Sequence, residues 1–243
     1  MYGAGMSVYA PSEGASSSPL APVLRQAGAV FSGRNGRSTP LHYGCAAGEL
    51  AVCVTGVGLL DRSDLTKLTI EAPAEQLSRL IARLTGGTLA PGGTLFAGHH
   101  WWCGAEPGSV IVLCERGLGA GLRARLQAER RHVAGLVVED RSDGWAAIAV
   151  IGRRTGEVLR SLGVYGESGD PREVPPFTAH TVGAIETWWL LESDRRALAL
   201  VPHDDAGRVW RAIERAGRSS GISYVGLEAA RRYSLLQRTA RPS

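Results

Sequence analysis

Residues 67–84, KLTIEAPAEQLSRLIARL, join a short apolar run to an amphipathic segment, and this combination decides the fold. The run 67–71 has the length and the alternation of a half-buried strand. Pro73 marks a turn after it, because proline punctuates regular structure. The apolar residues that follow recur at the i, i+3, i+4, i+7 spacing of one helix face: Leu77, Leu80, Ile81 and Leu84. The stretch therefore predicts a strand, a turn and a helix.

The same pattern recurs along the chain at residues 109–128, 146–163 and 197–217. The last copy, ALALVPHDDAGRVWRAIERAG, repeats the helical spacing at Val209, Trp210, Ile213 and Ala216. A repeated unit fixes an architecture before any motif does. We expect an α+β fold of two related subdomains, each an antiparallel sheet with helices. The two halves are expected at about 55–135 and 140–235, each with the order strand, helix, strand, strand, helix.

The N-terminal segment differs in composition from the rest of the chain. Residues 1–37 are rich in Gly, Ala, Ser and Pro and bury too little apolar surface to offset their ordering entropy. They predict a mostly disordered tail, although the apolar spacing at 24–31 is compatible with docking on the body. The folded module is expected to span 38–240.

The overall composition indicates an ordinary globular protein. The 243 residues are 44% hydrophobic and carry a formal charge of +4, almost all of it from dispersed arginines, since Lys67 is the single lysine. No aromatic platform or binding motif accompanies these charges, which argues against nucleic-acid binding.

No apolar stretch reaches the roughly 18 to 20 residues that span a bilayer, and no secretory signal is recognisable, so we expect a cytoplasmic protein without membrane contact. The four cysteines show no zinc spacing, so free thiols and no metal site are expected.

Three segments carry a resemblance to a known family: RSTPLHYG at 37–44, GVGLLDRSDLTKLTI at 56–70 and VWRAIERAGRSSGISYVGLEAAR at 209–231. In this order and spacing they resemble the folate-binding-domain superfamily of the glycine-cleavage T-protein (aminomethyltransferase). The resemblance covers about 39–232. It implies a short form without the C-terminal barrel, in this respect similar to the sarcosine oxidase gamma subunit, and a central cleft in which the T-protein binds tetrahydrofolate.

Several cleft positions of that family carry other residues here. His99 and His100 stand opposite the family's two aspartates, and Glu115 stands opposite its asparagine. Leu198 falls at the glutamate that grips the pterin, and Ala230 at a folate-contacting arginine, with Arg231 one place away. These replacements argue against ordinary aminomethyl transfer and leave tetrahydrofolate as a candidate cofactor, with no cofactor certain.

The residues nominate a small candidate site. Alternation along a strand directs only one of the two histidines into the cleft, and His100 is preferred as the general acid/base because imidazole titrates near neutrality. His99 and Glu115 are the further catalytic candidates, Glu115 as a partner of His100 or of a substrate amine. The alternatives are half-exposed strand residues for the histidines and core packing for the aromatic residues. The candidate binding residues are Tyr43, Trp101, Trp102, Trp188, Trp189 and Arg231.

Three functions follow from these expectations. The first is a small-molecule enzyme on the T-protein fold that uses His100 in the cleft between the subdomains, in biosynthesis or another specialised pathway. The second is a non-catalytic subunit that holds a partner enzyme chain, or a homo-oligomer. The third is a tetrahydrofolate-dependent aminomethyl or methyl transferase that binds the pterin differently, with Arg231 in the role of the family's folate-contacting arginine.

Overall fold

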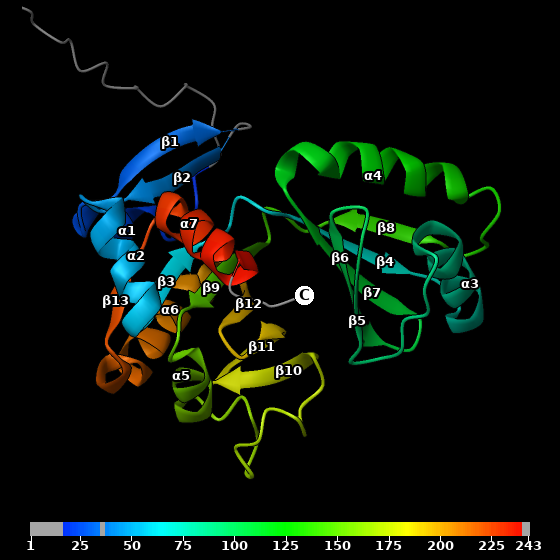
Figure 1. Ribbon diagram of the computed structural model, residues 1–243. Helices are drawn as coiled ribbons and strands as arrows, with labels where there is room; N and C mark the ends of the chain where they lie inside the picture. The colour runs from blue at the N-terminus through cyan, green and yellow to red at the C-terminus, as the bar shows by residue number, and fades with distance from the viewer. Residues whose placement is uncertain (1–16, 35–36, 240–243) are drawn as a thin grey trace, which may run out of the picture.

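A computed structural model describes residues 17–34 and 37–239 of the protein. Two large β-sheets lie between helices, and a two-stranded sheet stands apart from them (Figure 1). The strands pair antiparallel, except for the parallel pair β3–β13. The fold class is therefore α+β with antiparallel sheets, as expected. The six-stranded sheet has the order β10 (Phe177–Val182), β11 (Ile185–Ser193), β12 (Arg196–Pro202), β9 (Trp145–Ile151), β3 (Val57–Asp61) and β13 (Ile222–Tyr224). The five-stranded sheet has the order β5 (Thr94–Ala97), β6 (His100–Glu106), β7 (Ser109–Cys114), β4 (Thr66–Glu71) and β8 (Val137–Asp140).

The two sheets are built from the same succession of elements. The first unit runs β4, α3 (Ala74–Thr85), β5, β6, β7, α4 (Arg116–Glu129) and β8. The second runs β9, α5 (Thr155–Ser161), β10, β11, β12, α6 (Ala206–Ala216) and β13. Three strands separate the helices of each unit, one more than the sequence pattern indicated. The strand β3, expected in the first half, pairs instead with β9 of the other sheet, because the chain crosses between the sheets only after Asp61.

Each sheet is covered on its outer face by its own pair of helices. Apolar residues of α3 and α4 pack against β6 and β7 of the five-stranded sheet, through Trp102 and Val112. The helices α5 and α6 cover the six-stranded sheet in the same way. The residues of α3, α4, α5 and α6 buried in these two layers are Leu77, Leu80, Ile81, Leu122, Leu126, Val158, Leu159, Ala206, Val209, Trp210 and Ile213. The helical stripes in the sequence thus face the sheets, as their period predicts.

The inner faces of the two sheets meet in a third apolar layer. Alternate residues of β9 face opposite ways, as a pleated strand requires. Ile148 and Val150 join the layer under α5 and α6, whereas Ala149 and Ile151 join the layer between the sheets. The five-stranded sheet contributes Cys103, Ile111 and Leu113 to this inner layer. The run WAAIAVI is continuously apolar because β9 is buried on both faces.

The segment before the module is ordered in part. Residues 21–26 form α1 (Ala21–Gln26), and β1 (Val30–Arg34) pairs with β2 (Arg37–His42). Leu20 and Leu24 are fully buried in the layer under α5 and α6, and this burial offsets the ordering entropy. The expected tail is therefore too long at its C-terminal side, while residues 1–16 and 35–36 lie outside the described part of the chain.

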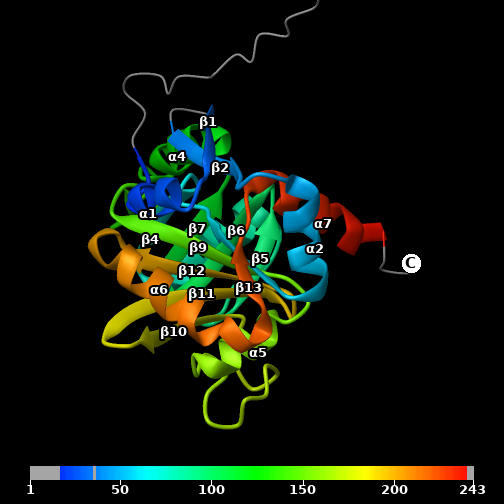
Figure 2. The ribbon, with the colours of Figure 1, turned by 90° about the vertical axis from the view of Figure 1, so that its left-hand side faces the viewer.

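The first and last segments of the family resemblance touch in space. The helix α7 (Leu227–Thr239) lies along α2 (Ala46–Thr55), as Figures 1 and 2 both show. The Glu49 carboxylate accepts backbone hydrogen bonds from Tyr43 and from Gly226, each at 2.7 Å. A Cβ atom on Gly226 would lie 1.9 Å from the carbonyl oxygen of Leu41, so only glycine fits there. Residues almost two hundred positions apart are thus fixed together ahead of α7.

One ammonium group holds the two connections between the sheets. The chain crosses between them at residues 62–65 and again at 141–144. The Lys67 side chain is fully buried. Its Nζ donates to the carbonyl oxygens of Ser63 and Leu65, both at 3.0 Å, and to that of Ser142 at 3.2 Å. A buried ammonium needs such partners to offset its desolvation.

Among the described residues, no helix is long and apolar enough to cross a membrane.

Candidate functional site

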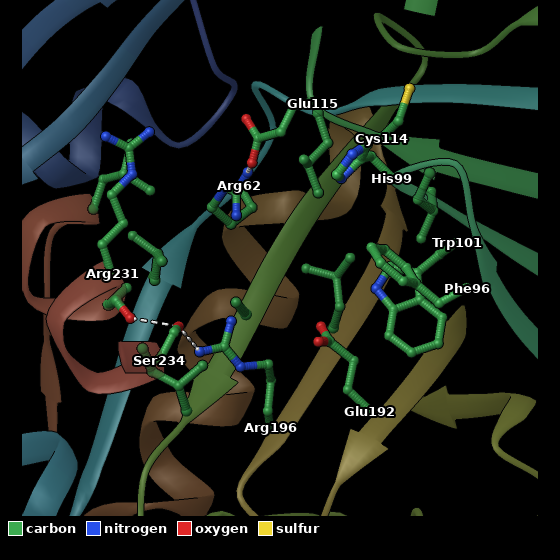
Figure 3. Close-up of a pocket in the computed structure, with 18 of the residues that line it drawn as sticks. Arg62, Phe96, His99, Trp101, Cys114, Glu115, Glu192, Arg196, Arg231 and Ser234 are labelled. Atoms are coloured by element: carbon green, nitrogen blue, oxygen red, sulfur yellow. Dashed lines mark hydrogen bonds and ion pairs between the residues drawn. The ribbon is translucent and has the colours of Figure 1, made fainter. Parts of the chain in front are cut away.

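A cavity of about 560 Å³ opens between the two sheets, with α7 on one side and the β5–β6 turn on the other (Figure 3). Its floor is the inner face of the six-stranded sheet. The floor residues are apolar: Leu60, Ala149, Ile151 and Leu198. A second hollow, of about 510 Å³, continues from it along Arg196, Ser234 and Arg238.

The α7 wall is one face of a helix. Its lining positions follow the helical period, which brings two guanidinium groups and a hydroxyl to the same side. The α7 residues that line the cavity are Leu227, Ala230, Arg231, Ser234, Leu235 and Arg238.

The guanidinium groups on this side differ in their partners. Arg231 and Arg238 make no hydrogen bond or ion pair with any described residue. Arg196, from the start of β12, donates to the Ser234 hydroxyl, which itself donates to the carbonyl oxygen of Ala230 at 2.8 Å. This wall therefore presents positive charge that described carboxylates leave unpaired.

The opposite wall is the β5–β6 hairpin. Ala97 pairs with His100, so Gly98 and His99 form a two-residue loop, and both have positive φ, 59° and 65°. That combination is typical of a type I′ turn, which matches the twist of the two strands. Because His99 sits in the turn, its ring lies outside the strand alternation and reaches the cavity. Trp101 lines the same wall, with its ring 5.1 Å from that of Phe96.

The carboxylate of Glu192 enters the cavity from the end of β11 (Figure 3). It makes no hydrogen bond or ion pair with any described residue. Burial raises the pKa of Glu192, and the nearby charges of Arg196 and Arg62 offset only part of this effect. A carboxyl group whose pKa is raised can exchange a proton closer to neutral pH than an ordinary glutamate.

Glu115 also lines the cavity, but it has a partner. Its carboxylate accepts a hydrogen bond from the Arg62 guanidinium at 2.7 Å, and Arg62 also donates to Asp64 at 3.0 Å. The two carboxylates compensate the charge of Arg62, which the protein largely buries. The expected pairing of Glu115 with His100 is therefore replaced by an ion pair with Arg62.

The structure reverses the choice between the two histidines. His99 lines the cavity, whereas His100 is not among the residues that line it. His100 begins β6 and shares a face with Trp102, which packs in the layer under α3 and α4. Its buried Nε2 has no hydrogen-bond partner among the described residues. Strand alternation does not divide the pair, because His99 belongs to the turn before β6, and its ring is the one that lines the cavity.

Of the candidate binding residues, Trp101 and Arg231 line the cavity and the others do not. Trp102 and Trp189 are core residues, and the Trp189 indole donates to the Thr187 hydroxyl at 2.8 Å. Trp188 stacks on Phe177 with ring centroids 5.0 Å apart. Tyr43 packs edge-on against Tyr224, with its buried hydroxyl lacking a partner among the described residues. Core packing accounts for these four positions.

The cavity also contains residues that sequence reasoning missed. The α7 spacing was readable, because Arg231, Ser234 and Arg238 follow a helical period. Glu192 carried a weaker signal, as the first charged residue after the apolar run WWLL. Arg62 carried none, because its place depends on where the chain crosses between the sheets. The missed residues are Arg62, Phe96, Glu192, Arg196, Ser234 and Arg238.

The described residues contain no group of histidine, cysteine and acidic side chains that could hold a metal ion. Two of the pterin contacts that the family resemblance implies are not repeated in this cavity. Leu198, at the position of the pterin-gripping glutamate, contributes an apolar side chain to the floor. Ala230 likewise offers no polar group where the resemblance implies an arginine. The two pterin contacts that the resemblance implies are therefore absent at these positions, and the polar groups of the cavity come from other residues.

No family model and no curated protein matches this sequence. Among solved structures, the glycine cleavage system aminomethyltransferase T from Bartonella henselae superposes with a TM-score of 0.72 at 16% identity, covering 88% of this chain and 60% of that one. A chain of the heterotetrameric sarcosine oxidase from Corynebacterium sp. U-96 superposes with a TM-score of 0.56 at 17% identity, covering 76% of this chain and 96% of that one. The chain therefore has the T-protein-like fold and spans 60% of the length of that aminomethyltransferase.

Proposed function

We propose that this protein is an enzyme that acts on a small molecule in the cavity between the two sheets, with Glu192 and His99 as its proton-transfer groups. The observation that carries the proposal is the carboxylate of Glu192, which enters the cavity and makes no hydrogen bond or ion pair with a described residue. A titratable group with a raised pKa in a cleft is a mark of catalytic sites.

The size and lining of the cavity support a small-molecule substrate. Its volume, about 560 Å³, lies within the roughly 300–1,000 Å³ of small-molecule sites. Its apolar floor, with charged and polar groups on the walls to fix a ligand, also supports such a site. His99 takes the role that the sequence pattern assigned to His100, because its ring is the one that lines the cavity.

Ordinary aminomethyl transfer on folate is not part of the proposal. Leu198 and Ala230 offer no polar group at the two positions where the resemblance implies folate contacts. A tetrahydrofolate-dependent transferase with an altered grip is a competing outcome of the experiment below. We place the protein in a reducing cytosol, which suits its four free cysteines.

A non-catalytic subunit is the second candidate. It is supported by the match over 96% of a chain from the sarcosine oxidase heterotetramer. It is also supported by exposed apolar side chains in the cavity lining, since Phe96 and Leu235 are both more than half exposed. Apolar groups gathered at one place can mark a protein contact. A stable monomer in solution would speak against this candidate.

The proposal is tested by filling the cavity. Leu198→Trp fills it from the floor and Ala230→Leu from the α7 wall, and circular dichroism checks that both variants remain folded. Binding of a panel of small carboxylates, small amines and tetrahydrofolate is measured by ligand-observed NMR. We expect at least one compound to bind the wild type and to lose binding in both variants.

Turnover of the bound compound is followed by mass spectrometry in the wild type and in Glu192→Gln. The substitution is expected to abolish turnover while binding persists. If no compound distinguishes the wild type from both filled variants, the small-molecule proposal is wrong. If tetrahydrofolate alone does so, the altered transferase replaces it.

A further inference from the structure

We propose that the cavity takes an aromatic carboxylate, whose anionic group binds to the α7 arginines and whose ring carries an N–H donor that faces Glu192. This inference rests on the proposed function, since it names the substrate class of the same cavity.

The charged side chains of the cavity lining are mostly cations. Arg62 is compensated by Asp64 and Glu115. Arg231 and Arg238 make no hydrogen bond or ion pair with a described residue, and Arg196 donates to the neutral Ser234 while its charge also acts on Glu192. Glu192 is the one further carboxylate among the residues that line this cavity. Positive charge therefore exceeds negative charge, and an anionic ligand would be drawn in.

The cations of the cavity lining are guanidinium groups, whose planar fork binds a carboxylate with two parallel hydrogen bonds. Arg231 and Arg238 lie two helical turns apart on α7, with Ser234 between them. A ligand anion at this face would meet two donors of the same kind from one rigid helix.

Both walls of the cavity also carry exposed apolar side chains. Phe96 is 56% exposed and Leu235 is 61% exposed, and they line the cavity from opposite walls. Trp101 stands beside Phe96, with the two rings tilted by 54°. A flat ring that enters over Leu198 would cover apolar surface that is otherwise exposed, which favours an aromatic body over an aliphatic polar one.

Glu192 stands on the side of the cavity floor toward Trp101 and Phe96 (Figure 3). A carboxylate there disfavours a second anionic group and accepts a hydrogen bond from a ring N–H. An amine without an anion would leave the α7 arginines unpaired, so the ligand needs both a donor and a carboxylate.

The test uses three probes: indole-3-acetate shares its side chain with 1-naphthaleneacetate and its indole ring with tryptamine. Indole-3-acetate has the carboxylate and the N–H, 1-naphthaleneacetate has only the carboxylate, and tryptamine has the N–H but an amine in place of the anion. Their affinities are measured by isothermal titration calorimetry. We expect indole-3-acetate to bind most tightly, 1-naphthaleneacetate to bind about tenfold or more weakly, and tryptamine not to bind.

Variants on one helix supply the matched comparison. Arg231→Gln and Arg238→Gln should each weaken indole-3-acetate by roughly ten- to a hundredfold, the usual effect of a lost charged hydrogen bond. Arg232→Gln, which removes an exposed arginine from the same helix but outside the cavity lining, should leave binding unchanged.

Equal effects of Arg231→Gln and Arg232→Gln, or tighter binding of tryptamine, would overturn the ligand class. The proposed function would survive that result if another compound still lost binding in Leu198→Trp and Ala230→Leu. It would fail with the ligand class only if no compound did so.

Discussion

The buried ammonium of Lys67 gives the sharpest stability prediction. Lys67→Met keeps the length of the side chain but removes the donor to three backbone carbonyl groups. Each buried carbonyl left without a partner costs about 1–3 kcal/mol, and relief of the ammonium desolvation returns part of the sum. We expect a loss of about 3–5 kcal/mol in the free energy of unfolding, the usual result when one member of a buried charged network is removed.

The measurement is equilibrium unfolding in urea, followed by tryptophan fluorescence and circular dichroism. The matched control is Arg79→Met, which removes an exposed cation paired with Glu75 and should cost no more than about 1 kcal/mol. If Lys67→Met costs as little as the control, the two connections between the sheets are not held by this ammonium, and the reasoning is refuted.

Three further predictions concern single positions. Gly226→Ala should prevent folding or lower the melting temperature sharply, because the added Cβ would overlap the Leu41 carbonyl oxygen. Gly121→Ala, in open space on α4, should instead stabilise the folded protein by roughly 0.5–1 kcal/mol, as measured by thermal unfolding. Iodoacetamide at pH 8 should modify Cys45 alone, because backbone N–H groups of Gly48 and Ala47 lower the pKa of this exposed thiol. Burial raises the pKa of Cys53 to about 12 and of Cys114 to about 11, and it also raises the pKa of Cys103. Mass spectrometry that shows a second rapidly modified cysteine would contradict this. The raised pKa of Glu192 means that the folded state holds this proton more tightly than the unfolded chain, so its contribution to stability is full at low pH and is lost as pH rises through the raised pKa. Glu192→Gln should therefore exceed the wild type in stability at neutral pH, with the difference shrinking in acid, and a pH-independent difference would be inconsistent with this origin.

The helices and most strands could be predicted because their signals are local. Leu77, Leu80 and Ile81 announce a helix face through their spacing alone, and they are buried where that face meets the sheet. The partner of a strand is a non-local property. The run 57–61 reads as a strand, yet nothing in it indicates that it pairs with β9 rather than with β4.

The site was predictable in part for the same reason. The sequence pattern placed both histidines on a strand, whereas His99 lies in a two-residue turn with positive φ, where strand alternation does not apply. A positive φ at a histidine is rarely indicated by a sequence. The Trp pairs look like pocket residues by composition, whereas their depth in the layers decides that most are core. Glu192 and Arg62 reach the cavity only through the packing of two sheets, which no local pattern encodes.

The most direct test of a small-molecule site between the sheets is a crystal structure of the protein grown with the tightest-binding compound of the panel. We predict electron density for that compound between α7 and the β5–β6 turn, with an anionic group at Arg231 or Arg238 and the ring beside Trp101. Density for the compound elsewhere on the protein, with this cavity holding only solvent, would contradict the central claim.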